Sequence, residues 1–214
     1  MVHIIKEDLD KDNYYKYSRI DTTEEITCDE NLGYIRFKNS VITTKSIILG
    51  LGNGIIAGGG IKAGREIIAG RGIRAGFGII AGWGIEAGNG IIAGDGIEAS
   101  DGIEAGWGIE AGFGIIAGEG IITGGEIEAG EGIEAGEGII AGWGIEAGEG
   151  IEAGWGIEAG LSIICRGILK FSYQLFAGIC TWRKTTEKDL IVECGKLETD
   201  GKIVLGNLIE TGNK

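Results

Sequence analysis

An isoleucine recurs every six residues from Ile55 to Ile163, and an alanine follows two residues after almost every one of them. The residue between them varies among Ile, Glu, Lys and Arg, and most hexads close with Gly-x-Gly, which gives the consensus I-x-A-G-x-G. Side chains two residues apart on a β-strand point to the same face, so Ile and Ala are expected inside and the residue between them outside. A six-residue period does not match the 3.6-residue turn of a helix. The pattern therefore predicts short strands joined by glycine corners.

Such a run of hexads is typical of a parallel β-solenoid, in which each hexad forms one side of a coil and the coils pair with each other. Glycine tolerates positive φ, and we expect the two glycines to use it at each corner. Three six-residue sides give coils of 18 residues and four give 24. The tetrapeptide IIAG recurs at a spacing of 24, which favours four sides. A square interior lined by one Ile and one Ala per side would leave voids, which cost about 24 cal/mol per Å³. We favour the triangle and interpret the longer spacing as a duplication unit, while the handedness stays open.

The sequence predicts a single all-β domain in three parts. We expect an N-terminal cap over 1–34, the β-solenoid over 35–167, and a C-terminal cap or further irregular coils over 168–214. Residues 1–34 are polar and aromatic and contain no hexads, and the run TWRKTTEKD, from Thr181 to Asp189, predicts a protruding loop or hairpin. Solenoid ends expose unpaired strand edges, so both flanks are expected to cover them.

The composition indicates an ordered, acidic protein. Glycine accounts for 44 of 214 residues and proline is absent, but the abundance of isoleucine argues against a disordered glycine-rich linker. The formal net charge is −13, and from Ala75 to Leu161 there are sixteen Asp and Glu residues but no Lys or Arg. Direct binding to DNA or RNA needs a basic surface and is therefore not expected. The acidic surface could serve solubility, mimic a nucleic acid, hold Ca²⁺ weakly or form a charge dipole along the solenoid.

The sequence also bears on the cellular compartment and on the presence of metal, cofactor or catalytic sites. It shows no leader pattern and no apolar run long enough to cross a bilayer, so neither export nor membrane binding is expected. The four cysteines, Cys28, Cys165, Cys180 and Cys194, have no C-x-x-C spacing and predict reduced thiols in a cytoplasmic protein. Cys165 replaces the inward alanine of its hexad and is expected in the core. We find no metal-ligand cluster, cofactor motif or nucleophile–base pair, and expect no metal, cofactor or catalytic residue.

Six aromatic residues occupy the variable position of Gly-x-Gly corners and form the candidate binding surface: Phe77, Trp83, Trp107, Phe113, Trp143 and Trp155. With 18-residue coils, Phe77 shares an edge with Phe113, Trp83 with Trp155, and Trp107 with Trp143. Exposed aromatic rings anchor many interfaces, which favours a partner or a sugar as ligand. The alternative is that each ring lies over glycines of the next coil and shields the backbone.

The hexads, such as Ile85-Glu86-Ala87, resemble the hexapeptide-repeat β-helices and, more loosely, the bactofilins, over about residues 55–167. Hexapeptide-repeat proteins usually place a small inward residue two positions before the large one, where this chain has Trp83, Asn89 or Glu119. Many of them are acyltransferases with a catalytic histidine. The one histidine here is His3, outside the repeat, so the resemblance does not imply that activity.

We therefore predict a non-catalytic structural or interaction protein, a rigid acidic rod or spacer that binds a protein partner or itself. The alternative is an acidic binding module that mimics nucleic acid, as pentapeptide-repeat gyrase inhibitors of similar architecture do. A weaker alternative is an enzyme with a site on the caps.

Overall fold

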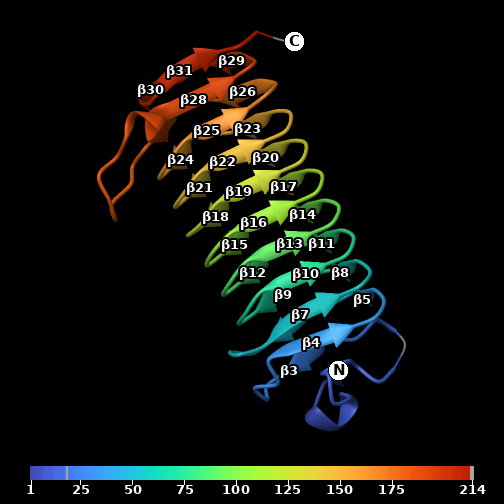
Figure 1. Cartoon of the computed structure of the whole chain (residues 1–214). Coiled ribbons are helices and arrows are strands. Elements are labelled where there is room, and N and C mark those ends of the chain that lie inside the picture. Colours follow the sequence, from blue (N-terminus) through green and yellow to red (C-terminus); the bar gives the residue numbers. More distant parts are fainter. Residues whose placement is uncertain (18, 213–214) are drawn as a thin grey trace.

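The computed structural model describes residues 1–17 and 19–212, which form one continuous parallel β-solenoid with three sheets (Figure 1). Successive coils lie in register, so that Ile73 pairs with Ile91 of the next coil, 18 residues further along the chain. The predicted three-sided coil is confirmed, and the four-sided alternative is wrong. IIAG tetrapeptides that are 24 residues apart therefore lie in neighbouring sheets, and not one above the other in the same sheet.

Each complete coil passes once through each sheet. Sheet 1 contains β4 (Tyr34–Phe37), β7 (Gly54–Ala57), β10 (Ile73–Ala75), β13 (Ile91–Ala93), β16 (Ile109–Ala111), β19 (Ile127–Ala129), β22 (Ile145–Ala147), β25 (Ile163–Cys165), β28 (Ile191–Cys194) and β31 (Asn207–Glu210). Sheet 2 contains β2 (Ile20–Thr22), β5 (Val41–Thr43), β8 (Ile61–Ala63), β11 (Ile79–Ala81), β14 (Ile97–Ala99), β17 (Ile115–Ala117), β20 (Ile133–Ala135), β23 (Ile151–Ala153), β26 (Ile168–Phe171) and β29 (Lys196–Thr199). Sheet 3 contains β1 (Val2–His3), β3 (Ile26–Cys28), β6 (Ile47–Leu49), β9 (Ile67–Ala69), β12 (Ile85–Ala87), β15 (Ile103–Ala105), β18 (Ile121–Thr123), β21 (Ile139–Ala141), β24 (Ile157–Ala159), β27 (Gln174–Ala177) and β30 (Lys202–Leu205). Two short 3-10 helices, η1 (Lys6–Asp8) and η2 (Glu187–Leu190), complete the structure.

The interior is a stack of isoleucine and alanine side chains. In β16, Ile109 and Ala111 are buried while Glu110 between them is exposed, as the alternation predicts. In-register pairing places the same residue type at equivalent positions of successive coils, so that Ile109 lies next to Ile127 in the following coil. Cys165 occupies an alanine position and is buried, as expected. The hexad thus supplies one large and one small inward residue per side, and the core grows by repetition.

The first glycine of a corner is favoured by close approach between coils, not by φ, although Ser100 occupies this position in one hexad, where its N–H donates over a longer 3.4 Å to the Ala81 oxygen. A Cβ on Gly130, the first glycine of its corner, would lie 2.0 Å from the carbonyl oxygen of Gly112 in the preceding coil. A Cβ on the second glycine, Gly132, would lie 3.5 Å from the Gly150 oxygen, an ordinary contact. The expectation that corner glycines use positive φ is wrong, because among the described residues glycine has positive φ at Gly33, Gly52, Gly178, Gly206 and Gly212, all outside the hexads. The second glycine can therefore be replaced, as it is by Glu66, Glu126 and Ser162.

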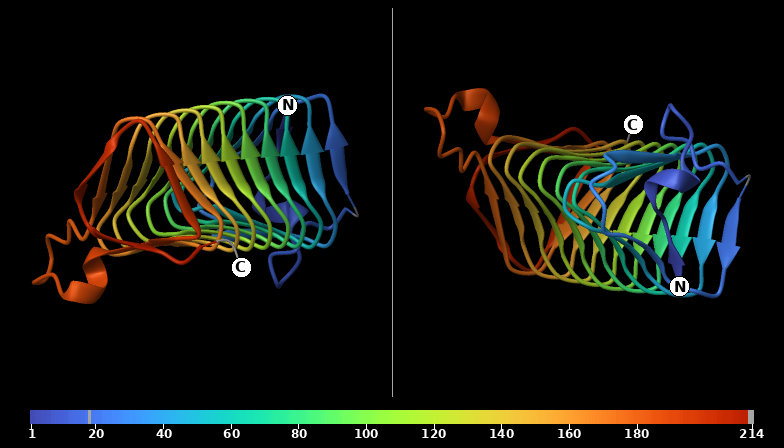
Figure 2. Two further views of the ribbon diagram at one scale, coloured as in Figure 1. Left: turned by 90° about the horizontal axis from the view of Figure 1, so that it is seen from above. Right: turned by 90° about the horizontal axis from the view of Figure 1, so that it is seen from below.

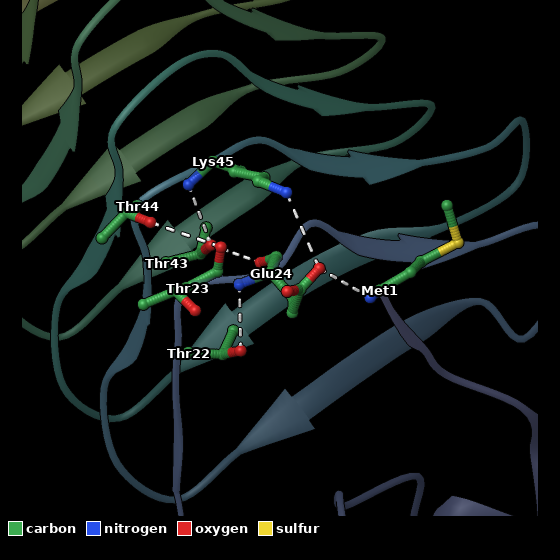
Figure 3. A network of polar contacts seen from close by, with 7 residues as sticks. All are labelled: Met1, Thr22, Thr23, Glu24, Thr43, Thr44 and Lys45. Carbon is green, nitrogen blue, oxygen red and sulfur yellow. Dashed lines mark hydrogen bonds and ion pairs between the residues drawn. The ribbon is translucent and has the colours of Figure 1, made fainter.

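A threonine at the last, inward-facing position of a strand forms a second type of corner. The Thr43 hydroxyl donates to the carbonyl oxygen of Glu24 in the preceding coil and accepts from the Lys45 N–H at 3.0 Å (Figure 3). The Glu24 carboxylate accepts from the N-terminal amine of Met1 at 2.9 Å, and the Lys45 ammonium lies 3.6 Å away. The hydroxyl therefore bridges two coils at a place where the repeat normally has a direct backbone hydrogen bond.

The N-terminal end of the solenoid is covered. The segment that carries η1 lies against the first coils (Figure 2). Its residues Ile4 and Leu9 are buried, and Leu9 forms an antiparallel bridge with Tyr15. The Tyr15 ring lies 5.3 Å from that of Phe37, measured between centroids. These apolar side chains close the N-terminal end of the core.

The last coil of the described residues has no further coil packed on it. Strands β26 to β31 continue the three sheets, and β29, β30 and β31 each have a hydrogen-bonded neighbour on one side only. Leu208 of β31 pairs with Val192 of β28, yet Leu208 is 40% exposed whereas Val192 is fully buried. Residues 168–212 keep the pairing register of the coils instead of folding across them, so among the two alternatives that the sequence left open, a cap or further irregular coils, they have the form of further coils.

Candidate functional site

The six aromatic residues singled out from the sequence all lie at corners between sheets, with side chains 47–73% exposed. The edge between sheets 1 and 2 carries Phe77 and Phe113, the edge between sheets 2 and 3 carries Trp83 and Trp155, and the edge between sheets 3 and 1 carries Trp107 and Trp143. The predicted pairing on edges is therefore correct. Binding by these side chains stays a prediction.

Two of the edges place charged side chains next to the rings. Between sheets 1 and 2, Asp95 lies between Phe77 and Phe113, since its N–H donates to the Phe77 carbonyl and its own carbonyl accepts from the Phe113 N–H. Between sheets 2 and 3, the Arg65 guanidinium lies over Trp83, 5.2 Å from the ring centroid. The coils between Trp83 and Trp155 present Asp101, Glu119 and Glu137 at the same corner position.

The third edge differs. Its corner positions run Trp107, Gly125, Trp143 and Leu161 in successive coils, and we call it the tryptophan edge. Gly125 between them has no side chain, and both indoles line one open hollow of about 430 Å³. Four further residues line this hollow besides the indoles and Gly125, namely Gly106, Gly108, Gly124 and Glu126. We call the space between Trp107 and Trp143 the indole slot.

The hexad Ile121–Glu126 creates the slot by departing from the consensus at two positions, Thr123 and Glu126, and by placing a glycine at the variable corner position. The hydroxyl of Thr123 donates to the carbonyl oxygen of Trp107 and accepts from the Gly125 N–H at 3.2 Å. A Cβ on Gly125 would lie 2.1 Å from that same carbonyl oxygen. At this corner the position where most coils have a side chain is a glycine, so the floor of the slot is bare backbone, whereas the threonine corner at Thr43 has Lys45 at the same position.

Glu126 supplies the charged wall of the slot. It replaces the second corner glycine, and its Oε1 lies 3.6 Å from the point that a Cβ on Gly144, next to Trp143, would occupy. Burial, together with the nearby carboxylates of Glu128 and Glu146, raises the pKa of Glu126. An ionised Glu126 is therefore held among like charges, and a cation bound beside it would relieve that repulsion.

The loop between β27 and β28 also reaches the tryptophan edge, which the sequence did not reveal. It projects from the side of the solenoid and contains η2 (Figures 1 and 2). Trp182 in this loop lies against Trp143, with ring centroids 6.4 Å apart. The tryptophan within the polar run TWRKTTEKD could have indicated an aromatic contact. Its partner, Trp143, lies far away in the sequence, so the pairing itself could not be predicted. The predicted protruding loop itself is confirmed.

The loop is held by a network around Asp189. Its carboxylate accepts two hydrogen bonds from the Arg183 guanidinium, at 2.7 and 2.8 Å, and two more from the N–H and hydroxyl of Thr186. The Arg183 guanidinium and these hydrogen bonds hold the pKa of Asp189 well below its usual range. A carboxylate with four donors makes a compact anchor for an otherwise polar loop.

Other reactive groups are dispersed. All four cysteines are free thiols, and Cys28, Cys165 and Cys194 are buried. Burial, with a contribution from Cys194, raises the pKa of Cys165 to about 12, so that thiol is a core residue rather than a nucleophile. Within the described residues, no group of three or more His, Cys, Asp and Glu side chains is arranged to hold a metal ion. In the same residues, no helix has the length and apolar character needed to cross a bilayer.

Comparisons with models of protein families, with curated proteins and with solved structures gave no match to this chain.

Proposed function

We propose that this protein is a non-catalytic structural or interaction protein, a rigid acidic rod that associates with a second copy through its C-terminal end. The observation that carries this proposal is the difference between the two ends. Ile4 and Leu9 are buried at the N-terminal end, whereas Leu205 and Leu208 remain about 40% exposed in the last coil.

The strand edges point in the same direction as the exposed leucines. Within the described residues, the outer sides of β29, β30 and β31 have no strand partner, and an edge of this kind is a template for pairing with another chain, although the Leu197 N–H of β29 donates to the Glu210 carboxylate at 2.7 Å. Head-to-tail stacking is blocked, because the N-terminal segment with η1 covers the opposite end. A two-fold contact between two C-terminal ends uses the same surface on both copies and closes the assembly as a dimer.

Two finer statements belong to this proposal. The I-x-A hexads support a relationship with the hexapeptide-repeat proteins and the bactofilins, of which the bactofilins would match a self-associating rod. Free and mostly buried thiols support a cytoplasmic location.

Light scattering on the purified chain tests the dimer. We expect a mass of twice 22.3 kDa, and a monomer for Leu208→Asp, which places a charge on the last coil. Ile140→Asp is the matched control, because Ile140 is 41% exposed but lies on the side of the rod; it should remain a dimer. A monomeric wild type, or a Leu208→Asp variant that still dimerises, would contradict the proposal, and long filaments would contradict the closed N-terminal end.

The second candidate is an acidic module that mimics nucleic acid. It is supported by the ladder of Glu110, Glu128 and Glu146, which lie in register on three successive coils and are all exposed. Inhibition of gyrase supercoiling, lost in a variant with these three residues changed to Gln, would support it, and unimpaired supercoiling would count against it. The alternative of an enzyme with a site on the terminal segments stays a hypothesis with no residue assigned to it.

A further inference from the structure

The dimensions of the indole slot suit a flat group. Trp107 and Trp143 are two coils apart, and strands in a sheet are spaced by about 4.8 Å, so their corner backbones are separated by roughly 9.6 Å. A planar group stacked between two rings needs about 3.5–4.0 Å on each side, or roughly 7–8 Å in all. The two indoles can therefore hold one flat group between them with modest side-chain adjustment. The slot has room for one layer and no more.

The slot is maintained by the structure around it. Gly125 leaves the floor without a side chain, and a Cβ there would lie 2.1 Å from the Trp107 carbonyl oxygen with the backbone as it stands. On its far side, Trp143 is backed by Trp182 of the loop, which limits the positions its indole can take. The neighbouring corner position beyond Trp143 is occupied by Leu161.

The charge around the slot selects a cation. Glu126 lines the hollow itself, and none of the residues that line it is Lys or Arg. Glu128 and Glu146 lie near Glu126 and add to the negative potential. Indole faces attract cations most strongly among the aromatic side chains.

The chain itself shows which cation a corner tryptophan takes. On the edge between sheets 2 and 3, Arg65 occupies the corner of the coil before Trp83 and places its guanidinium 5.2 Å from the indole centroid. On the tryptophan edge, the corresponding neighbour between the two indoles is Gly125. The hexad Ile121–Glu126 therefore leaves empty the position that corresponds to Arg65 beside Trp83.

We propose that the indole slot binds the guanidinium group of an arginine side chain presented by a polypeptide partner. The guanidinium is planar, stacks on aromatic faces and donates to a carboxylate in a fork, which matches the two indoles and Glu126. This contact lies on the side of the rod and is independent of the proposed dimerisation at the C-terminal end.

A peptide with a single arginine, acetyl-Gly-Arg-Gly-amide, is the probe, since several charges would bind the acidic surface without using the slot. Titration is followed by the indole N–H resonances, assigned with Trp→Phe variants. We expect saturable shifts at Trp107 and Trp143 but not at Trp155, and at least tenfold weaker binding for the otherwise identical citrulline peptide, which has the same shape without the charge.

Variants separate the slot from general attraction to acidic residues. Trp107→Ala and Glu126→Gln should each weaken binding at least about fivefold, whereas Trp155→Ala, at an equally exposed corner, should leave it unchanged. Circular dichroism would verify that each variant is folded. Equal binding of the arginine and citrulline peptides, or unchanged affinity in folded Trp107→Ala, would overturn the proposal.

Discussion

The indole of Trp182 lies against that of Trp143, with a centroid distance of 6.4 Å and an angle of 33° between the planes. The contact joins the one long loop of the C-terminal coils to the tryptophan edge, and it depends on the position of the loop. That position is set by Asp189, which receives four hydrogen bonds from Arg183 and Thr186.

Changing Asp189 to Asn should release the loop. An amide cannot accept from both the guanidinium and the backbone as a carboxylate does, so we expect trypsin to cleave at Arg183 and Lys184 several times faster in Asp189→Asn. Glu187→Gln, at an exposed position of η2 outside this network, should be cleaved at the wild-type rate. Equal cleavage of all three proteins would refute the anchoring role.

The same anchor should respond to acid. The pKa of Asp189 is lower in the folded protein than in the unfolded chain. Its contribution to the stability of the loop is therefore complete above the ordinary aspartate pKa of about 3.9 and is lost as the pH falls through the lower folded-state pKa. The loop should therefore stay closed from neutral pH down to about pH 4 and open below it. The Trp182 indole resonance would report the change in the wild type, and Asp189→Asn should show no such transition.

The two glycines of one corner should differ sharply in their tolerance of a methyl group. Gly130→Ala places Cβ 2.0 Å from a backbone oxygen and should destabilise by roughly 1–3 kcal/mol or more, since neither backbone can move without breaking the ladder. A Cβ at Gly132 has ordinary clearance, so Gly132→Ala should be neutral or should stabilise the protein by about 0.4–1 kcal/mol, because alanine lowers the conformational entropy of the unfolded chain. Urea unfolding of the pair measures the difference; equal midpoints would mean that the coils are not packed at this spacing.

Carboxylates stacked in register should make the rod sensitive to salt. Glu128 lies between Glu110 and Glu146 in sheet 1, so Glu128→Lys replaces two repulsions by two attractions, each worth about 0.2–1 kcal/mol. We expect a higher melting temperature at low ionic strength and a smaller gain in 0.5 M NaCl. The wild type should itself become more stable as NaCl is added.

Sheet 3 offers the control for this charge reversal. Glu158 has Ile140 and Phe176 as its in-register neighbours, so Glu158→Lys should change stability little. A similar gain in both variants would show that net charge, rather than the ladder, governs stability. A natural counterpart of the designed pair exists in sheet 2, where Lys170 forms an ion pair with Glu152 of the preceding coil.

The period of the sequence was enough to predict the coil. Ile109, Glu110 and Ala111 alternate inward and outward because a strand has a two-residue period, and a regular six-residue interval leaves little choice of register. The pairing of corner aromatics on edges followed by arithmetic once the coil had three sides. These features depend on interactions between residues that are equivalent in the repeat, so the repeat itself encodes them.

Tertiary structure alone decided the features that depend on non-equivalent residues. The preference for glycine at Gly130 comes from the carbonyl oxygen of Gly112, and the bare floor of the indole slot lies against the Trp107 carbonyl oxygen, neither of which is visible in local propensity. The contact of Trp182 with Trp143 and the uncovered last coil of the described residues likewise depend on where irregular segments settle in space. The sequence by itself determined a rod of six-residue sides with an isoleucine and alanine core and favoured three sides; the pairing between coils decided that number, and the distances between them decided which surfaces are filled and which remain open.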